Sequence, residues 1–299
     1  MALFILGQYI FDKMKRKILF INPSYRPHWS RCEPTGLLYI ASYLLKMGIE
    51  VKILDLNIER KTIIEILCYI ENYNPNFIGI SSITRQALRG YRLGRVIKKK
   101  FPNIYLIYGG VHPTLLPLEC FEKGVTDCVV IGEGERSIYE LINKISSGKS
   151  IKDIRGIYFR SGKEIVKTSG RDFIDDLDSL PPPDYSLVPL SRYNSNIHIK
   201  NYPGKTINMI TSRGCTGNCY YCCSPFLYKR KIRFRSAENI VKEIKQLIQK
   251  YNIKNIHFHD DNFLFDPLII KKICQLIIKN SLSFKWICLA RADIISQNP

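Results

Sequence analysis

The first 150 residues alternate short apolar runs with longer amphipathic stretches. Apolar residues at helical spacing between the runs predict helices over residues 35–47, 57–72, 85–100 and 136–145. Strands that are apolar on both faces favour a parallel sheet covered by helices on both sides. We therefore expect a flavodoxin-like doubly wound α/β domain over residues 14–150, with its ligand beyond the carboxyl ends of the strands. The predicted strands are residues 17–22, 51–56, 77–82, 104–110 and 128–135.

The alternation stops at residue 151 and resumes at residue 204. Residues 151–203 contain a predicted hairpin that turns at Ser161–Gly162, followed by an acidic and proline-rich stretch typical of an extended connector. Three further strand and helix units then run from residue 204 to residue 299. Their predicted strands are residues 207–211, 253–258 and 284–290, and their predicted helices are residues 237–251, with Ser236 as N-cap, and 267–280.

Charge and hydropathy narrow the class of protein. The 45 Lys and Arg residues outnumber the 26 Asp and Glu residues, which gives a formal net charge of +19. Such a charge suits a nucleic-acid partner, but it is spread along the chain without a nucleic-acid-binding module, so compositional bias is the preferred explanation. The sequence contains no long uncharged apolar run, so it predicts no transmembrane helix. It also predicts no signal peptide before Met14, which is the expected natural start. We expect a cytoplasmic protein.

Three of the ten cysteines carry the candidate chemistry. Cys215, Cys219 and Cys222 stand in the string CTGNCYYC, a C-x3-C-x2-C spacing directly after an apolar strand. Three thiolates on one loop can hold three corners of a cubane iron–sulfur cluster and leave one iron open. Structural zinc requires four ligands, usually in two separated pairs, and Cys223 is too close to Cys222 to serve as the fourth. A disulfide is disfavoured without an export signal.

The cysteine string resembles the signature of the radical S-adenosylmethionine (SAM) family. The strings RFRSAENIVKEI, NIHFHDDNF and WICLARAD are similar to the first three βα units of its cobalamin-linked branch. The resemblance implies a (β/α)6 partial barrel, a 4Fe–4S cluster on the three cysteines, and SAM bound at the open iron for cleavage to a 5′-deoxyadenosyl radical. Since three units cannot close such a barrel, we expect the chain to be part of a longer protein.

The same resemblance assigns roles near the cluster. It implies that Tyr221 lies beside the cofactor, that Asp260 and Asp261 face SAM or substrate, and that Arg291 pairs with the SAM carboxylate. Strand ends line the active site of such barrels, and arginine matches a carboxylate with two parallel hydrogen bonds.

Each of these assignments has a structural alternative. Asp260 or Asp261 could cap the helix that begins at Pro267, and Arg291 could be a solvated loop charge. His257 and His259 share one face of a strand, so they could bind a metal ion or simply line the barrel.

The amino-terminal strings GISSIT, YGGVHPTLLP and VVIGEGE resemble a cobalamin-binding domain. The D-x-H-x-x-G string that supplies a cobalt ligand in some cobalamin proteins is absent, and His28 is the only candidate in the loop after the first strand. We expect no protein ligand below the cobalt of a bound cobalamin. The alternative is a domain that no longer binds cobalamin and has only a packing role. By the resemblance, Ser81, Ser82 and Thr84 would bind the nucleotide tail, and Gly109, Gly110, Gly132 and Gly134 would let the backbone approach the ligand.

The resemblance implies a cobalamin-dependent radical SAM enzyme that methylates an unactivated carbon. Its substrate would be a small or lipid-like molecule, and its electron donor a flavodoxin or ferredoxin. Two alternatives remain open: a radical cyclase or rearrangement enzyme of the anaerobic chlorophyll-cyclase type, and a non-catalytic cobalamin or redox sensor.

Overall fold

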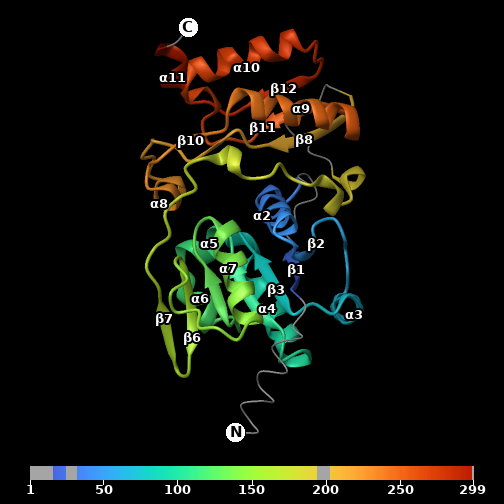
Figure 1. Cartoon of the computed structure of the whole chain (residues 1–299), viewed down its shortest axis with the longest axis vertical. Coiled ribbons are helices and arrows are strands. Elements are labelled where there is room, and N and C mark those ends of the chain that lie inside the picture. The colour runs from blue at the N-terminus through green and yellow to red at the C-terminus, as the bar shows by residue number, and fades with distance from the viewer. Residues whose placement is uncertain (1–15, 25–31, 194–202, 298–299) are drawn as a thin grey trace. The chain divides into compact units, whose positions relative to one another are not determined.

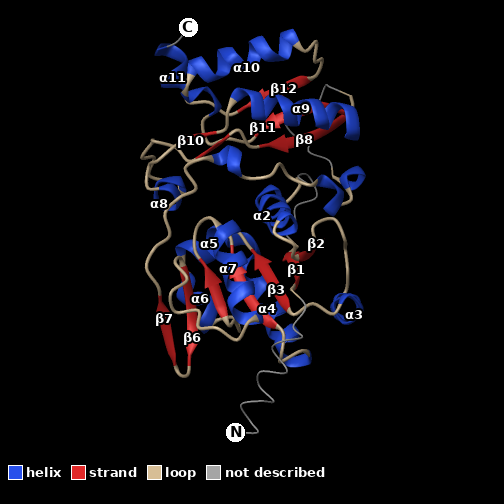
Figure 2. Cartoon of the chain, in the orientation of Figure 1, coloured by secondary structure: helices blue, strands red, loops and turns tan. Residues whose placement is uncertain are grey.

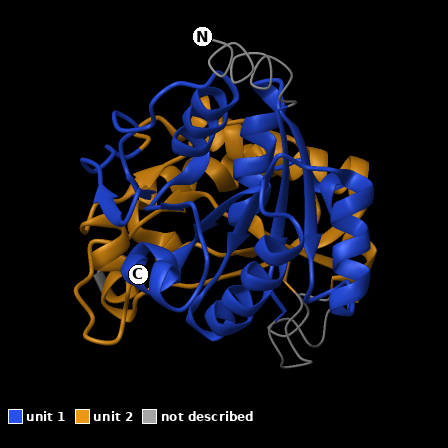
Figure 3. Cartoon of the chain, turned by 90° about the horizontal axis from the view of Figure 1, so that it is seen from below, with its two compact units in different colours: residues 1–26, 36–173, 183–188 blue, residues 27–35, 174–182, 189–299 orange. Residues whose placement is uncertain are grey.

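The computed structural model describes residues 16–24, 32–193 and 203–297 (Figure 1). The chain divides into two compact units that are interleaved along the sequence (Figure 3). The first comprises residues 1–26, 36–173 and 183–188, and the second comprises residues 27–35, 174–182 and 189–299. His28 lies outside the described residues, so its role stays a prediction.

The first unit is built on a seven-stranded sheet (Figure 2). Its strands follow the order β2-β1-β3-β4-β5-β6-β7, and the first five pair in parallel. The order 2-1-3-4-5 is that of flavodoxin-like proteins, so the predicted fold class is confirmed. These strands are β1 (Lys17–Asn22), β2 (Glu50–Asp55), β3 (Phe77–Ser81), β4 (Tyr105–Gly109) and β5 (Cys128–Val130).

The predicted hairpin is present, but it belongs to this sheet and not to a connector. Strand β6 (Ile157–Ser161) pairs antiparallel with β5, and β7 (Glu164–Lys167) pairs with β6. The buried side chains of Ile157 and Phe159 give β6 the face that packs on the core. The compact unit that contains this sheet keeps residues 36–173 together, so it extends beyond the domain boundary predicted at residue 150.

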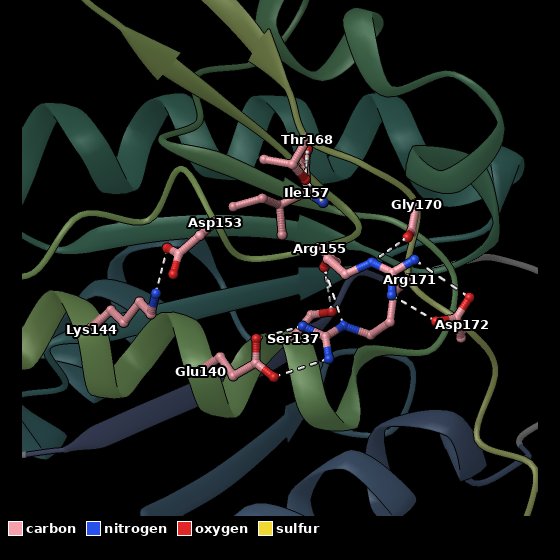
Figure 4. Close-up of polar contacts among 10 residues, drawn as sticks. All are labelled: Ser137, Glu140, Lys144, Asp153, Arg155, Ile157, Thr168, Gly170, Arg171 and Asp172. Atoms are coloured by element: carbon pink, nitrogen blue, oxygen red, sulfur yellow. Dashed lines mark hydrogen bonds and ion pairs between the residues drawn. The ribbon is translucent and has the colours of Figure 1, made fainter.

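Ion pairs tie the hairpin to helix α7 (Gly134–Ser146), as Figure 4 shows. The Arg171 guanidinium donates to both carboxylate oxygens of Glu140, at 3.0 and 2.5 Å. Lys144 of α7 pairs with Asp153 in the segment before β6. Bidentate pairs of this kind fix geometry as well as charge, so the hairpin is an integral part of the domain.

The helices of the first unit show one clear error of prediction. Helix α3 begins at Ile63, not at residue 57. The Asp55 carboxylate accepts a hydrogen bond from the backbone of Asn57 and so holds a turn there, and Thr62 with Glu65 forms a capping box six residues later than expected. The helices are α2 (Thr35–Lys46), α3 (Ile63–Tyr73), α4 (Thr84–Lys100), α5 (Val111–Leu115), α6 (Pro117–Glu122) and α7; the short α5 and α6 had no clear sequence signal.

The second unit contains a three-stranded parallel sheet in the order β12-β11-β8. The helices between its strands begin and end close to the predicted positions, since Ser236 caps α9 and Asp266 caps α10. No helix of the described residues is long and apolar enough to cross a membrane. The elements are β8 (Lys205–Met209), β9 (Ser212–Arg213), α8 (Ser224–Tyr228), β10 (Arg233–Phe234), α9 (Ala237–Tyr251), β11 (Ile253–Phe258), α10 (Pro267–Lys279), β12 (Lys285–Cys288) and α11 (Ala292–Gln297).

Candidate functional site

The cysteine loop of the second unit is closed at its base by two short strands. β9 and β10 pair antiparallel, so residues 214–232 form one loop that contains all the clustered cysteines. Gly214 begins this loop at φ +95°, where a Cβ would lie 2.1 Å from the Lys231 carbonyl oxygen. A side chain at position 214 would therefore force the two sides of the loop apart.

Each of the three signature sulfurs accepts one N–H donor at 3.4 Å. The backbone N–H of Gly217 donates to Cys215, that of Ser224 donates to Cys222, and Nη1 of Arg291 donates to Cys219. Donors of this kind stabilise thiolate sulfur and tune the potential of a cluster bound to it.

Cys223 has a different environment. Desolvation and the neighbouring Cys222 sulfur raise the pKa of the Cys223 thiol, which disfavours the thiolate that a metal needs. Among the described residues, no three His, Cys, Asp or Glu side chains gather closely enough to hold a metal ion. Three thiols on one loop supply the ligand chemistry of a cluster with three protein ligands, but their sulfurs are not gathered into a binding site in this structure, so Cys215, Cys219 and Cys222 as its ligands stay a prediction.

Asp260 anchors the start of the cysteine loop. It is 1% exposed, and its Oδ1 accepts hydrogen bonds from the backbone N–H and hydroxyl groups of both Thr211 and Ser212. Burial raises the pKa of Asp260, although the hydrogen bonds from Ser212 and Thr211 oppose that rise. These contacts make Asp260 a buried anchor of the strand end, and its predicted role toward SAM or substrate stays a prediction. The alternative of helix capping is wrong, because α10 is capped by Asp266.

Asp261 and Arg291 both contact the loop. The Ser224 hydroxyl donates to Asp261 Oδ2 at 2.6 Å, at the first residue of α8. Arg291 pairs with Asp293 and points Nη1 at Cys219. Hydrogen bonds to Asp293 and then Cys219 raise the pKa of Arg291, so it stays charged beside the cysteines. Arg291 therefore contacts the cysteine loop as well as Asp293, and its pairing with the SAM carboxylate stays a prediction.

Tyr221 projects from the same loop and is 93% exposed, and its neighbour Tyr220 is fully exposed. Exposed aromatic side chains beside a binding loop suit contact with a ligand or partner. No contact in the described residues assigns Tyr221 to a cofactor, so that role stays a prediction.

In the first unit, the loops after β3 and β4 lock together. The Ser82 backbone N–H donates to the Gly109 carbonyl at 3.0 Å, and a Cβ on Gly110 would lie 2.8 Å from the Ser81 hydroxyl oxygen. Gly110 adopts φ +95°. Ser81, Ser82, Gly109 and Gly110 are thus brought together at the carboxyl edge, where doubly wound domains bind ligands.

The remaining residues predicted to approach cobalamin are Gly132, Gly134 and Thr84, and their surroundings differ. Gly132, at φ +73°, has no atom within 4 Å of a would-be Cβ, so it leaves open space after β5. Gly134 instead packs tightly, since a Cβ there would lie 2.9 Å from Ile40. Thr84 begins α4 and contacts the imidazole of His112 at 3.4 Å.

His112 is a residue of this edge that the sequence analysis missed. It is buried, and its Nε2 lies 2.9 Å from the Tyr91 hydroxyl and 3.4 Å from a Glu119 oxygen. Its backbone N–H donates to the Ser82 carbonyl. The string GGVHPT was the available signal, because the glycine pair marks the turn after β4 and His112 follows it in the first turn of the short helix α5.

Comparison with protein families agrees with both units. Residues 30–142 match the B12 binding domain, and residues 209–293 match the radical SAM superfamily. The chain therefore combines a region similar to B12 binding domains with a region similar to the radical SAM superfamily. The first match contains Ser81, Gly110 and Gly134, and the second contains the three cysteines, Asp260 and Arg291.

Two relatives of this chain are named for two different reactions, methyl transfer and ring closure. The chain is 30% identical to an uncharacterized methyltransferase of Pyrococcus horikoshii over 88% of its own length, and 30% identical to an anaerobic magnesium-protoporphyrin IX monomethyl ester cyclase of Synechocystis over 93%. It spans 56% of each relative. The solved structure of the cobalamin-dependent SAM radical enzyme OxsB, at 21% identity, matches 95% of this chain and 40% of that one with a TM-score of 0.78, which supports the fold.

The loop junction of this radical SAM protein gives a specific prediction. Gly110→Ala should lower the affinity for hydroxocobalamin at least tenfold. The new Cβ would have to displace Ser81 and Ser82, and the alanine would have to adopt a positive φ that L-residues rarely adopt. Spectral titration measures the affinity, and circular dichroism checks the fold. Gly162→Ala is the control, since Gly162 is also at positive φ but sits in the hairpin turn. Equal affinity of the Gly110→Ala variant and the wild type would contradict a binding role for this edge.

Proposed function

We propose that this protein is a cobalamin-dependent radical SAM enzyme that methylates an unactivated carbon. The observation that carries the proposal is the cysteine loop, closed by β9 and β10, with an N–H donor on each signature sulfur and with Arg291 beside Cys219. When bound, the cluster supplies the electron that cleaves SAM to methionine and a 5′-deoxyadenosyl radical, and cobalamin supplies the methyl group.

The chain's own residues hold and orient these groups. Cys215, Cys219 and Cys222 would hold the cluster, and Arg291, with its fixed positive charge, would bind the SAM carboxylate. Asp260 accepts hydrogen bonds that hold the strand end at the start of the cysteine loop. Asp261 accepts a hydrogen bond from Ser224, the first residue of α8. The edge formed by Ser81, Ser82, Thr84, Gly109, Gly110, Gly132 and Gly134 would receive cobalamin.

The substrate is a small or lipid-like molecule, and a flavodoxin or ferredoxin donates the electron. A cytoplasmic location fits this role, because the described cysteines are all free thiols and an open iron–sulfur cluster needs a reducing compartment. A radical cyclase is the second candidate, since the cyclase relative is as similar to this chain as the methyltransferase relative.

Transfer of a labelled methyl group tests the proposal. The protein in its full natural length, loaded with cluster and cobalamin, is incubated with methyl-labelled SAM, dithionite and a metabolite extract of its source. Methylation predicts label in a product, together with 5′-deoxyadenosine. Formation of 5′-deoxyadenosine without label transfer would favour a cyclase, and binding of both cofactors without SAM cleavage would favour a sensor.

A further inference from the structure

The outer face of helix α4, labelled in Figure 1, carries only basic and aliphatic side chains. The helix contains seven Lys and Arg residues and no Asp or Glu. With about 3.6 residues per turn, eight of its positions lie on the side opposite its buried residues. We call these eight residues the α4 face, and six of them are basic. They are Arg85, Leu88, Arg89, Arg92, Arg95, Val96, Lys99 and Lys100.

The basic composition of the whole chain does not account for this face. Helix α3, which contacts α4, contains no Lys or Arg, and α7 contains two basic and two acidic residues. Like charges three and four residues apart destabilise a helix, so the α4 face would be stabilised by a negatively charged partner.

Within the described residues, acidic side chains do not neutralise the middle of the α4 face. Arg92 and Lys99 make no hydrogen bond or ion pair with another described residue. Arg89 and Arg95 donate only to backbone carbonyl and hydroxyl oxygens. The charges at these four positions therefore remain available to a negatively charged surface.

Exposed aliphatic side chains surround these charges. Leu88 is 63% exposed within the α4 face, and Ile64 of α3 is 73% exposed. Helix α4 contacts both α3 and α5, and α3, α4 and α6 bury one common core cluster, so these helices cover the same side of the sheet. Apart from Leu45, all the exposed large hydrophobic side chains described in the first unit lie in this stretch. They are Ile63, Ile64, Ile83, Leu88, Leu116, Leu118 and Val125.

Basic side chains among exposed aliphatic ones match the chemistry of an anionic membrane surface. Lys and Arg are attracted to negatively charged lipid headgroups, and aliphatic side chains insert at the boundary between headgroups and acyl chains. Proteins that bind single-stranded nucleic acid combine their basic groove with aromatic side chains for stacking, and the α4 face has no aromatic residue. A lipid surface is therefore the partner that satisfies both the charge and the apolar area.

We propose that the α4 face, with the exposed aliphatic side chains around it, docks the first unit on an anionic membrane surface. This docking uses none of the residues predicted to bind cobalamin or the cluster, so it is independent of the proposed function. It also narrows the substrate to a lipid that is taken from the bilayer, and this second step rests on the proposed function.

Flotation with lipid vesicles tests the docking with the full-length protein. Wild type should bind vesicles of phosphatidylcholine mixed with phosphatidylglycerol, bind pure phosphatidylcholine vesicles far more weakly, and lose binding as salt rises. Arg92→Glu/Lys99→Glu should lower the binding at least tenfold, because two basic charges become acidic. Leu88→Ser should lower it about threefold or more, because an inserting side chain is lost.

Lys242→Glu/Lys245→Glu is the matched control, since both lysines are exposed on α9 and the change in net charge is the same. This control should bind as wild type does, and circular dichroism checks the fold of every variant. An equal loss of binding in both double variants would overturn the assignment to the α4 face. If Arg92→Glu/Lys99→Glu loses binding to oligonucleotides or to a flavodoxin and keeps its vesicle binding, the membrane is the wrong partner.

The substrate step is tested with full-length protein loaded with cluster and cobalamin. Methyl-labelled SAM and dithionite are added together with vesicles made from lipids of the protein's source. We expect label in a lipid, at least tenfold less label with Arg92→Glu/Lys99→Glu, and unchanged 5′-deoxyadenosine formation by that variant without vesicles. Label only in water-soluble products of a whole-cell extract would overturn the lipid step. A wild type that forms no 5′-deoxyadenosine contradicts the proposed function instead, while the vesicle-binding result stands by itself.

Discussion

Replacing Cys215, Cys219 or Cys222 by alanine should abolish the broad absorption shoulder at about 400 nm that anaerobically reconstituted protein is expected to show. The three sulfurs lie in one closed loop, and each accepts an N–H donor, which Arg291 supplies for Cys219. The loss of any one of the three sulfurs should therefore remove a ligand of the proposed cluster. Iron and sulfide analysis of the purified variants gives the same readout independently of absorption.

Cys223→Ala is the matched control for this experiment. Cys223 lies next to Cys222, but its raised thiol pKa disfavours a metal-bound thiolate, so the variant should keep its cluster. A cluster that survives in Cys215→Ala and disappears in Cys223→Ala would show that the ligand assignment is wrong.

Asp260→Ala should destabilise the second unit by about 3–5 kcal/mol, because it leaves the buried donors of Thr211 and Ser212 without an acceptor. The loss should unlock the strand end that leads into the cysteine loop, so cluster content should fall with stability. Urea unfolding followed by tryptophan fluorescence measures the change, since Trp286 lies in the adjacent β12.

Asp260→Asn separates the acceptor from the charge. Asparagine keeps an oxygen for these donors, so the loss should be far smaller than with alanine. Because the folded pKa of Asp260 is raised, the stability contributed by its protonated form is complete below the ordinary aspartate pKa of about 4 and is lost as pH rises through the folded value. Wild type should therefore lose stability relative to Asp260→Asn as pH rises. An unchanged difference across that range would contradict the buried-carboxyl description.

Local signals in the sequence predicted much of the fold. Helix α9 begins at its predicted residue because Ser236 supplies a cap within the same segment, and strands β1 and β11 match their apolar runs. The start of α3 was missed where two local signals compete, since the Asp55 turn overrides the helical pattern. The sheet position of β6 could not be predicted, because its partner β5 is chosen by tertiary packing.

The candidate site was predicted only as far as motifs reach. Cys215, Cys219 and Cys222 are recognisable because their spacing lies within eight residues of sequence. The contacts that organise the site join distant segments: Arg291 reaches Cys219 across 72 residues, and Asp260 reaches Thr211 across 49. Spacing along the chain carries no information about such pairs, so only the structure could assign Asp260 as an anchor.

The most direct test of the proposed radical SAM chemistry is the reductive cleavage of SAM. Full-length protein with its cluster is reduced with dithionite under argon and incubated with SAM, and 5′-deoxyadenosine is measured by mass spectrometry. We predict 5′-deoxyadenosine that depends on dithionite and disappears in Cys219→Ala. A protein that holds its cluster, binds SAM and still forms no 5′-deoxyadenosine on reduction would contradict the proposal.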